Sequence, residues 1–226
     1  MSAQQDQVFC RLDKWLRILN DELIEMRVNQ HIYEEVRQIV HENPSVQEPA
    51  DFYEWMFKMY TWSQAATLRR LVDAHRDCIS FRRLLVNLKL NPGVLTRSRF
   101  KAMFVDRDYT EHDADELFDQ LVGPGKEYPE TPDLDAELDL LTRKTKKLVD
   151  FVDRRVAHRD RGNIQETPTI DDLNAAIDHL EDLLRKYWNL FRGFDTPQLL
   201  PIWQYDWRSV FTSPWIQAQA EDESLQ

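Results

Sequence analysis

Apolar residues recur at intervals of three and four along most of the chain, and this is the spacing of amphipathic helices. Clusters rich in proline, such as residues 43–49 and 91–93, interrupt the pattern and divide it into segments. The helices expected in the first half of the chain cover residues 6–42 (one helix or two in line), 51–75, 80–90 with Asp77 or Ser80 as its cap, 96–105 and 111–122. The pattern therefore predicts an all-α fold.

The segment 51–75 is rich in aromatic side chains. We expect its apolar and small residues to form one stripe that faces the core, where the small residues would let another helix approach closely. The stripe consists of Phe52, Trp55, Met56, Met59, Tyr60, Ser63, Ala66 and Leu71.

Two long helices are expected in the second half of the chain. One begins after Thr169, which with Asp172 resembles a capping box, and ends at Gly193. The other begins near Asp133 and carries an apolar seam at steps of four and three, formed by Leu134, Leu138, Leu141, Thr145, Leu148, Val152 and Val156. Residues 1–193 are thus predicted to fold as a bundle of about six to seven helices.

The remaining residues, 194–226, form an aromatic-rich C-terminal extension. Aromatic side chains at this density seldom stay in water. The extension contains Trp203, Tyr205, Trp207, Phe211 and Trp215. We expect it to pack on the bundle or to take part in a dimer interface.

Composition narrows the class of protein. Five glycines in 226 residues argue against a turn-rich all-β fold. The first residues lack the basic and apolar regions of a signal peptide, and the chain has no long apolar run, so we expect a cytoplasmic protein without a membrane span. Cys10 and Cys78 are too few for a disulfide framework or a thiolate metal site, and we interpret both as buried apolar residues.

Charge is distributed unevenly along a chain whose formal net charge is −11. Residues 61–109 carry a net charge of +6 and residues 141–161 carry +5, whereas the segments around them are acidic. If these two basic segments are neighbours in the fold, they would form one positive surface able to hold a phosphate backbone. Acidic helices that pair with basic ones within a bundle would produce the same alternation.

The second basic segment contains His158 among several arginines. At about 100° per residue, one face of a helix would present Lys147, Phe151, Arg154 and His158. A histidine placed between arginines and the carboxylates of Asp153 or Asp160 would suit proton transfer near neutral pH. The alternative is a histidine that only caps the carbonyls of a helix end.

Other catalytic patterns are missing from the sequence. None of the six histidines has a glutamate three positions before it, which excludes the usual di-iron site of a helical bundle. There is also no His-Glu-x-x-His zinc motif, no Gly-rich phosphate loop and no Gly-x-Ser-x-Gly elbow. We expect neither a metal nor a cofactor.

The stretch RRVAHRD, residues 154–160, resembles the arginine and histidine region of HEPN domains, in particular their abortive-infection branch of AbiU type. Residues 63–88 resemble a second recurring block of that family, in which an Arg-Leu-x-Asp run at 70–73 is followed by Ser80 and paired leucines. The resemblance covers residues 10–192.

This resemblance implies a helical bundle that forms a homodimer and cleaves RNA without a metal, in phage defence or in a toxin–antitoxin system. In the family, the histidine moves protons at the ribose 2′-hydroxyl and the arginine stabilises the phosphate, in a cleft to which both subunits contribute. His158 matches the motif histidine. The family places four to six residues between the two, and the corresponding positions hold Phe151, Val152 and Asp153, while Arg154 stands one residue too close.

We therefore expect His158 and Arg154 to be the catalytic residues. Residues expected to support them or to bind phosphate are Arg70, Asp73, Lys147, Asp153, Arg155, Arg159 and Asp160. The expected partners are a second copy of the chain, RNA, and a cognate antitoxin or defence protein, with no membrane. Because the motif arginine is missing from its usual positions, the alternative is a HEPN-like bundle that binds RNA, a nucleotide or a partner protein without cleavage.

Overall fold

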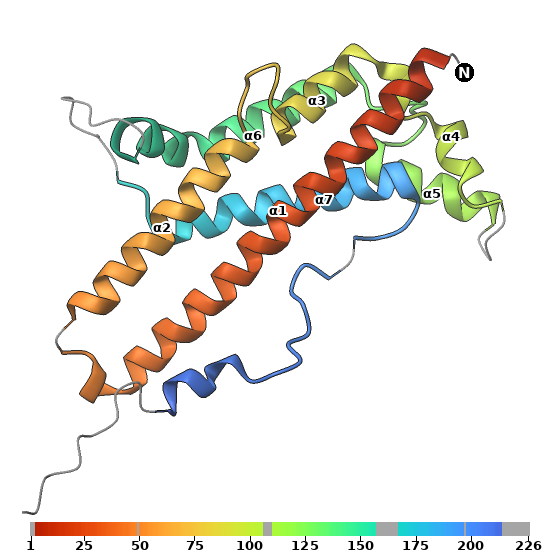
Figure 1. The fold of residues 1–226 in the computed structure, drawn as a ribbon. Helices are drawn as coiled ribbons and strands as arrows, with labels where there is room; N and C mark the ends of the chain where they lie inside the picture. The colour runs from red at the N-terminus through yellow and green to blue at the C-terminus, as the bar shows by residue number, and fades with distance from the viewer. Residues whose placement is uncertain (1–2, 49, 106–109, 157–166, 197, 214–226) are drawn as a thin grey trace, which may run out of the picture.

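The computed structural model describes residues 3–48, 50–105, 110–156, 167–196 and 198–213. Within these ranges the chain contains seven α-helices and no strand (Figure 1). The helices are α1 (Ala3–Glu42), α2 (Asp51–Leu71), α3 (Phe81–Leu90), α4 (Arg97–Ala102), α5 (Glu111–Val122), α6 (Thr131–Phe151) and α7 (Ile170–Arg192). None of them is both long and apolar enough to cross a membrane. The predicted all-α bundle of six to seven helices is confirmed.

α1 is the longest element, and its 40 residues form one continuous helix rather than two in line. Its leucines at positions 12, 16, 19 and 23 recur every three or four residues and are completely buried. This face packs on α7, and α2 runs beside α1 on another side (Figure 1).

α7 contributes the most buried side chains and lies against α1 and α6. Its first turn is closed by the predicted capping box: the Asp172 N–H donates to Thr169 Oγ1 at 3.1 Å, and the Thr169 N–H donates to the Asp172 carboxylate at 2.7 Å. Its last turn ends at Gly193, which adopts a left-handed conformation with φ of +66°. Both predicted ends of this helix are therefore confirmed.

The apolar stripe expected on α2 faces the core only in part. Leu68 and Leu71 are buried, but Trp55 and Met59 are 58% and 38% exposed, and Phe52 is 48% exposed. Ser63 and Ala66 are exposed too. For the aromatic residues the reason is that α6 and α7 pack against the C-terminal half of α2, whereas its N-terminal half extends past them beside α1 (Figure 1). Ser63 and Ala66 lie in the C-terminal half, but at about 100° per residue they point away from the buried face of Leu68. The prediction that the whole stripe is core was wrong.

The long helix expected from Asp133 to Val156 has two parts. The α-helical part, α6, buries Leu134, Leu141, Thr145 and Leu148 as the seam predicts. Residues Val152–Val156 then form a π-helical turn, whose hydrogen bonds reach one residue further back than those of an α-helix. The spacing of about 100° that aligned Lys147 with Arg154 therefore does not continue past Phe151.

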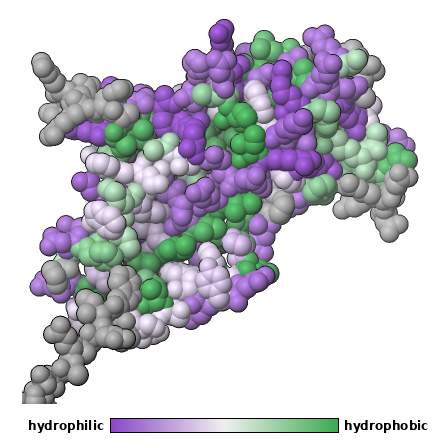
Figure 2. Space-filling view, in the orientation of Figure 1, coloured by the Kyte–Doolittle hydropathy of each residue, from purple (hydrophilic) through white to green (hydrophobic). Residues whose placement is uncertain are grey.

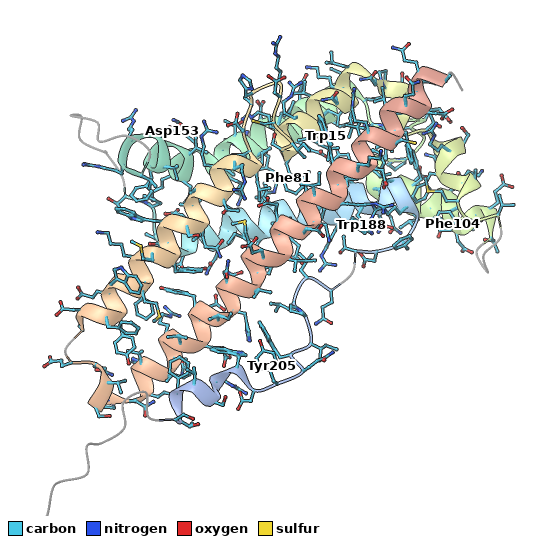
Figure 3. The ribbon with its side chains drawn as sticks, viewed as in Figure 1. Trp15, Phe81, Phe104, Asp153, Trp188 and Tyr205 are labelled. Atoms are coloured by element: carbon cyan, nitrogen blue, oxygen red, sulfur yellow. The ribbon has the colours of Figure 1, made fainter. Side chains whose placement is uncertain are left out.

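The segment 198–213 runs back along the outside of the bundle toward the C-terminal end of α1, which lies near the N-terminal end of α2 (Figure 1). The Trp203 ring stacks on His31 of α1 with centroids 6.1 Å apart, and Arg208 pairs with Glu35 at 3.3 Å. Tyr205, labelled in Figure 3, is 71% exposed. The described part of the aromatic extension thus lies on α1. Trp215 is outside the described residues. The division of the chain into a bundle and an extension at residue 193 stays a prediction.

The two cysteines are not buried as expected. Cys10 is exposed and Cys78 is half-buried. Cys10 lies two positions before the buried Leu12, and residues two apart point to different sides of a helix.

Candidate functional site

The two basic segments of the sequence are neighbours in the fold. α2 and α3 pack against α6, and α2 also contacts the π-helical turn. Arg69 of α2 reaches Asp153 in this turn, and Arg82 of α3 donates to the Thr142 hydroxyl of α6 at 2.5 Å. The condition for a shared positive surface is therefore met.

Most cations of these two segments are nevertheless paired with carboxylates inside the bundle. Examples, with the distance between the side-chain nitrogen and the carboxylate oxygen, are Lys89 with Asp135 at 2.5 Å, Arg97 with Asp115 at 3.1 Å, Lys101 with Asp115 at 2.7 Å, Lys146 with Asp150 at 2.6 Å and Lys147 with Asp172 at 2.8 Å. Arg70 with Glu22, Arg97 with Asp119 and Arg99 with Asp6 are further pairs. Pairing within the bundle, the alternative weighed for the charge pattern, accounts for most of it.

Four cations of the second segment are different. Arg143 and Lys144 on α6 and Arg154 and Arg155 in the π-helical turn are exposed. No ion pair or hydrogen bond joins their side chains to another residue in the part of the chain that the structure describes. An anion can therefore bind these side chains without first breaking an ion pair to a carboxylate of the described residues.

Arg69 connects α2 to the turn that carries Arg154 and Arg155. Its Nε donates to Asp153 Oδ1 at 2.9 Å, and its Nη1 pairs with Asp73. We refer to Arg69, Asp73 and Asp153 as the Arg69 cluster. Figure 3 shows Asp153 in the turn, at the edge of the bundle. Because Arg154 directly follows Asp153, the cluster fixes the backbone from which the free arginines project.

Asp73 also organises the loop between α2 and α3. Its Oδ1 accepts a hydrogen bond from the His75 N–H at 2.7 Å, and its backbone carbonyl accepts one from Ser80 Oγ at 2.6 Å. Ser80 in turn caps α3, since its Oγ accepts from the Arg83 N–H at 3.1 Å. Ser80, one of the two predicted caps, is therefore the cap of α3.

The contacts within the Arg69 cluster favour the charged forms of Asp73 and Arg69. The hydrogen bond from the His75 N–H, followed by that from Arg69, lowers the pKa of Asp73 against the opposing effect of burial. Asp73 first and Asp153 second raise the pKa of Arg69 through their hydrogen bonds. Since one cation meets two carboxylates, the cluster alone carries a net negative charge. Among the described residues of the π-helical turn, Arg154 and Arg155 supply the positive charge.

The predicted site residues fall into three groups. Asp73 and Asp153 meet in the Arg69 cluster, next to Arg154 and Arg155. Arg70 and Lys147 are engaged elsewhere, by Glu22 of α1 and by Asp172 of α7. The Lys147 ammonium, with the Thr169 N–H, lowers the pKa of Asp172 to about 2. His158, Arg159 and Asp160 lie outside the described residues.

The three positions at which the family expects its arginine do not offer a free cation. Phe151 is half-buried, Val152 is 5% exposed, and the Asp153 carboxylate accepts a hydrogen bond from Arg69. The guanidinium of Arg69 does lie beside Asp153, but Arg69 belongs to α2 and also pairs with Asp73.

Arg69 and His75 were not singled out by the sequence pattern, although a signal for them exists. Five residues separate Arg69 from His75 and four separate Arg70 from His75, which is the spacing of the family motif. The His75 side chain is 65% exposed in the loop that Asp73 organises. A second histidine thus lies on the same loop as one member of the cluster.

Comparison with known proteins gives the following result. The family model HEPN_AbiU2, described as AbiU2, matches residues 9–207. This range includes α1 from residue 9 onward, the Arg69 cluster, the π-helical turn and α7. No curated protein and no solved structure matches the chain significantly.

Proposed function

The chain belongs to the AbiU2 family of HEPN domains, and from this premise we propose that it is an abortive-infection effector that acts on RNA at the π-helical turn. The observation that supports this function is the pair of exposed arginines, Arg154 and Arg155, in a basic region where most other cations are neutralised. A guanidinium matches the geometry of a phosphate with two donors, and it stays charged at every relevant pH.

In this proposal Arg154 binds the phosphate and His158 transfers the proton. Abstraction of the ribose 2′-hydroxyl proton by an imidazole lets that oxygen attack the adjacent phosphorus, and protonation of the leaving 5′-oxygen completes the cleavage. An arginine beside the crowded phosphate stabilises its additional charge. RNA is the substrate because DNA lacks the attacking hydroxyl.

Cleavage of total RNA in the presence of a chelator tests this function. The wild-type protein is expected to cleave, and His158→Ala and Arg154→Ala are each expected to lower the rate by about 100-fold or more. Arg37→Ala is a matched control, because Arg37 is an exposed arginine of α1 that makes no ion pair with any described residue. Equal cleavage by all four proteins would exclude His158 and Arg154 as catalytic residues. A further variant, His75→Ala, tests the other histidine: if it alone lost activity, the proton-transfer role would belong to His75 in the loop that Asp73 organises.

A binding function without cleavage is the second candidate, and one observation favours it. At the usual motif positions the chain has a buried valine and an aspartate that is already bonded to Arg69. A protein that only binds would retain RNA on a filter and leave its length unchanged. The proposed effector would retain RNA and also cleave it.

A further inference from the structure

Arg82 on α3 is a half-buried cation that has no carboxylate beside it. Its Nη2 donates to the Thr142 hydroxyl of α6 at 2.5 Å, and no ion pair joins Arg82 to another residue within the described ranges. A guanidinium has five N–H donors, so most donors of Arg82 are unused. A cation that is partly withdrawn from water is stabilised by an anion. Arg82 is therefore held in one place, with donors that an anion can take.

Arg143 directly follows the residue that holds Arg82. At about 100° per residue it points away from the buried Leu141, and its side chain is exposed without an ion pair to any described residue. Thr142 faces α3, so the two arginines lie at the same level of α6. We call Arg82 and Arg143 the distal arginines. Asp139, which is exposed one turn earlier, marks the end of this positive stretch.

The distal arginines share the outward face of α6 with Arg154. In the π-helical turn, Val152 is buried and Asp153 is bonded to Arg69 of α2, so the next position points outward, as Arg143 does. Arg154 follows Arg143 by eleven positions, which is about 15 Å at the rise of a helix. Two groups of unpaired arginines therefore lie on one face, too far apart to hold one phosphate together in an ordinary geometry.

The charges between these two groups are neutralised within the bundle. Lys146 pairs with Asp150 at 2.6 Å, and Lys147 pairs with Asp172 at 2.8 Å. Positive charge is thus available at two places along α6 and not between them. Figure 2 shows mainly hydrophilic side chains along the upper edge of the molecule, where Figure 1 places α3 and the loop before it.

We propose that the distal arginines form a second phosphate-binding site, which holds the RNA strand several nucleotides away from the phosphate at Arg154. At about 3.4 Å per stacked nucleotide, 15 Å corresponds to about four nucleotides, and to fewer in an extended strand. The strand then follows the outward face of α6. This inference rests on the proposed function, because it takes RNA as the ligand, but it does not require cleavage.

A site of this kind has a defined effect on substrate choice. Phosphate contacts position a strand and do not read its bases, so the distal arginines select for length and not for sequence. They also lie away from the reacting phosphate, so they contribute equally to the bound substrate and to the transition state. Their loss is expected to raise KM for a long RNA and to leave kcat unchanged.

Fluorescence anisotropy with labelled RNA of two lengths tests the distal site, in the full chain carrying His158→Ala so that no strand is cut. A strand of about twelve nucleotides spans both sites, whereas a dinucleotide has one phosphodiester and occupies one. Arg82→Ala with Arg143→Ala is expected to weaken binding of the long strand by about tenfold or more, and binding of the dinucleotide far less. Thr142→Val, which removes the hydroxyl that holds Arg82, is expected to give a smaller loss.

Lys14→Ala with Arg37→Ala is the matched control, because both are exposed cations of α1 without an ion pair to a described residue. Far-UV circular dichroism verifies that each variant is folded. Arg143→Ala alone separates binding from structure: a purely structural Arg82, joining α3 to α6, would leave this variant with the affinity of the wild type.

The outcomes separate the distal site from the cleavage proposal. A loss for the long strand that is confined to the distal variants supports the site, even if the wild type cleaves no RNA. Unchanged binding by the double distal variant, or an equal loss in the control, overturns the site even if His158 proves catalytic. A protein that binds neither strand overturns it as well.

Discussion

At the scale of single residues, the Arg69 cluster owes its importance to position more than to energy. Its three side chains are between 24% and 49% exposed, and ion pairs at such exposure contribute only about 1 kcal/mol or less to the free energy of unfolding. What the cluster does is join two elements, because it links the end of α2 to the turn after α6. Apolar packing also holds the turn, since Val152 is buried in the core and Val156 packs against it.

Arg69→Ala is therefore expected to loosen the turn with little loss of global stability. We expect the free energy of unfolding to fall by about 1 kcal/mol or less, because both lost ion pairs are partly exposed. The amides of residues 152–156 should exchange hydrogen markedly faster, since local opening no longer breaks the pair with Asp153. Hydrogen exchange followed by mass spectrometry measures both regions, and protection unchanged at 152–156 would contradict the role of Arg69.

Asp172 makes stability depend on pH. Its pKa is lowered to about 2, by the Lys147 ammonium first and the Thr169 N–H second. A carboxyl whose pKa is lower in the folded chain stabilises the fold above its unfolded pKa of about 3.9, and this contribution is lost as the pH falls toward the folded value. Asp172→Asn is thus expected to cost about 1 kcal/mol at pH 7.

The same difference between wild type and Asp172→Asn should shrink as the pH decreases from about 4 to about 2. Urea unfolding at several pH values measures it. A difference that stays constant over that interval would show that the carboxylate charge of Asp172 is not what stabilises the start of α7.

At the scale of elements, helix ends were predictable because their signals are local. The Thr169 and Asp172 capping box and Gly193 act on backbone groups within a few residues, so the sequence alone identifies them. For α3 the sequence offered Asp77 and Ser80, and the structure selects Ser80. The π-helical turn at 152–156 was not predictable in this way. Its seam residue Val152 continues the apolar pattern of α6 and is buried, and periodicity does not distinguish a wider turn from a regular one.

Two glycines allow the end of α7 to be tested with an internal control. Gly193 and Gly125 both have a left-handed conformation, with φ of +66° and +71°. A Cβ on Gly193 would lie 2.9 Å from the Phe104 ring, whereas a Cβ on Gly125 would meet nothing within 4 Å. The two positions therefore differ in the packing around the glycine rather than in its backbone.

Gly125→Ala is expected to lower the free energy of unfolding by about 1 kcal/mol through backbone strain alone. Gly193→Ala should lower it by about 2 kcal/mol or more, because Phe104 is buried and has little room to move. Thermal or denaturant unfolding of the two variants gives the comparison. Equal losses would mean that the contact with Phe104 does not constrain the end of α7.

At the scale of the whole molecule, the fold followed from the sequence and the surface did not. The three-and-four spacing identified the helices, because burial of one face is a property of each segment by itself. Which face of α2 would be covered depends on where α6 and α7 end, and segment patterns carry no information on that. The two basic segments were recognised as a candidate surface, but the carboxylates that neutralise most of it come from distant parts of the chain, as with Asp6 for Arg99.

The same reasoning explains what was missed at the candidate site. Asp73 and Asp153 were singled out separately, and the residue that joins them, Arg69, became visible only in the structure. Resemblance to the family directed attention to His158 and Arg154. That Arg154 and Arg155 are free became visible only when the structure showed most other cations of the two basic segments paired with carboxylates.

The account rests most directly on the claim that Arg154 and Arg155 form a phosphate-binding edge. Fluorescence anisotropy with a labelled single-stranded RNA, measured at several salt concentrations, tests it. Arg154→Ala with Arg155→Ala should weaken binding and reduce the salt dependence of log K by about 1 to 2. Arg37→Ala should leave both unchanged. If the double variant bound RNA with the affinity and salt dependence of the wild type, the phosphate-binding edge would be contradicted.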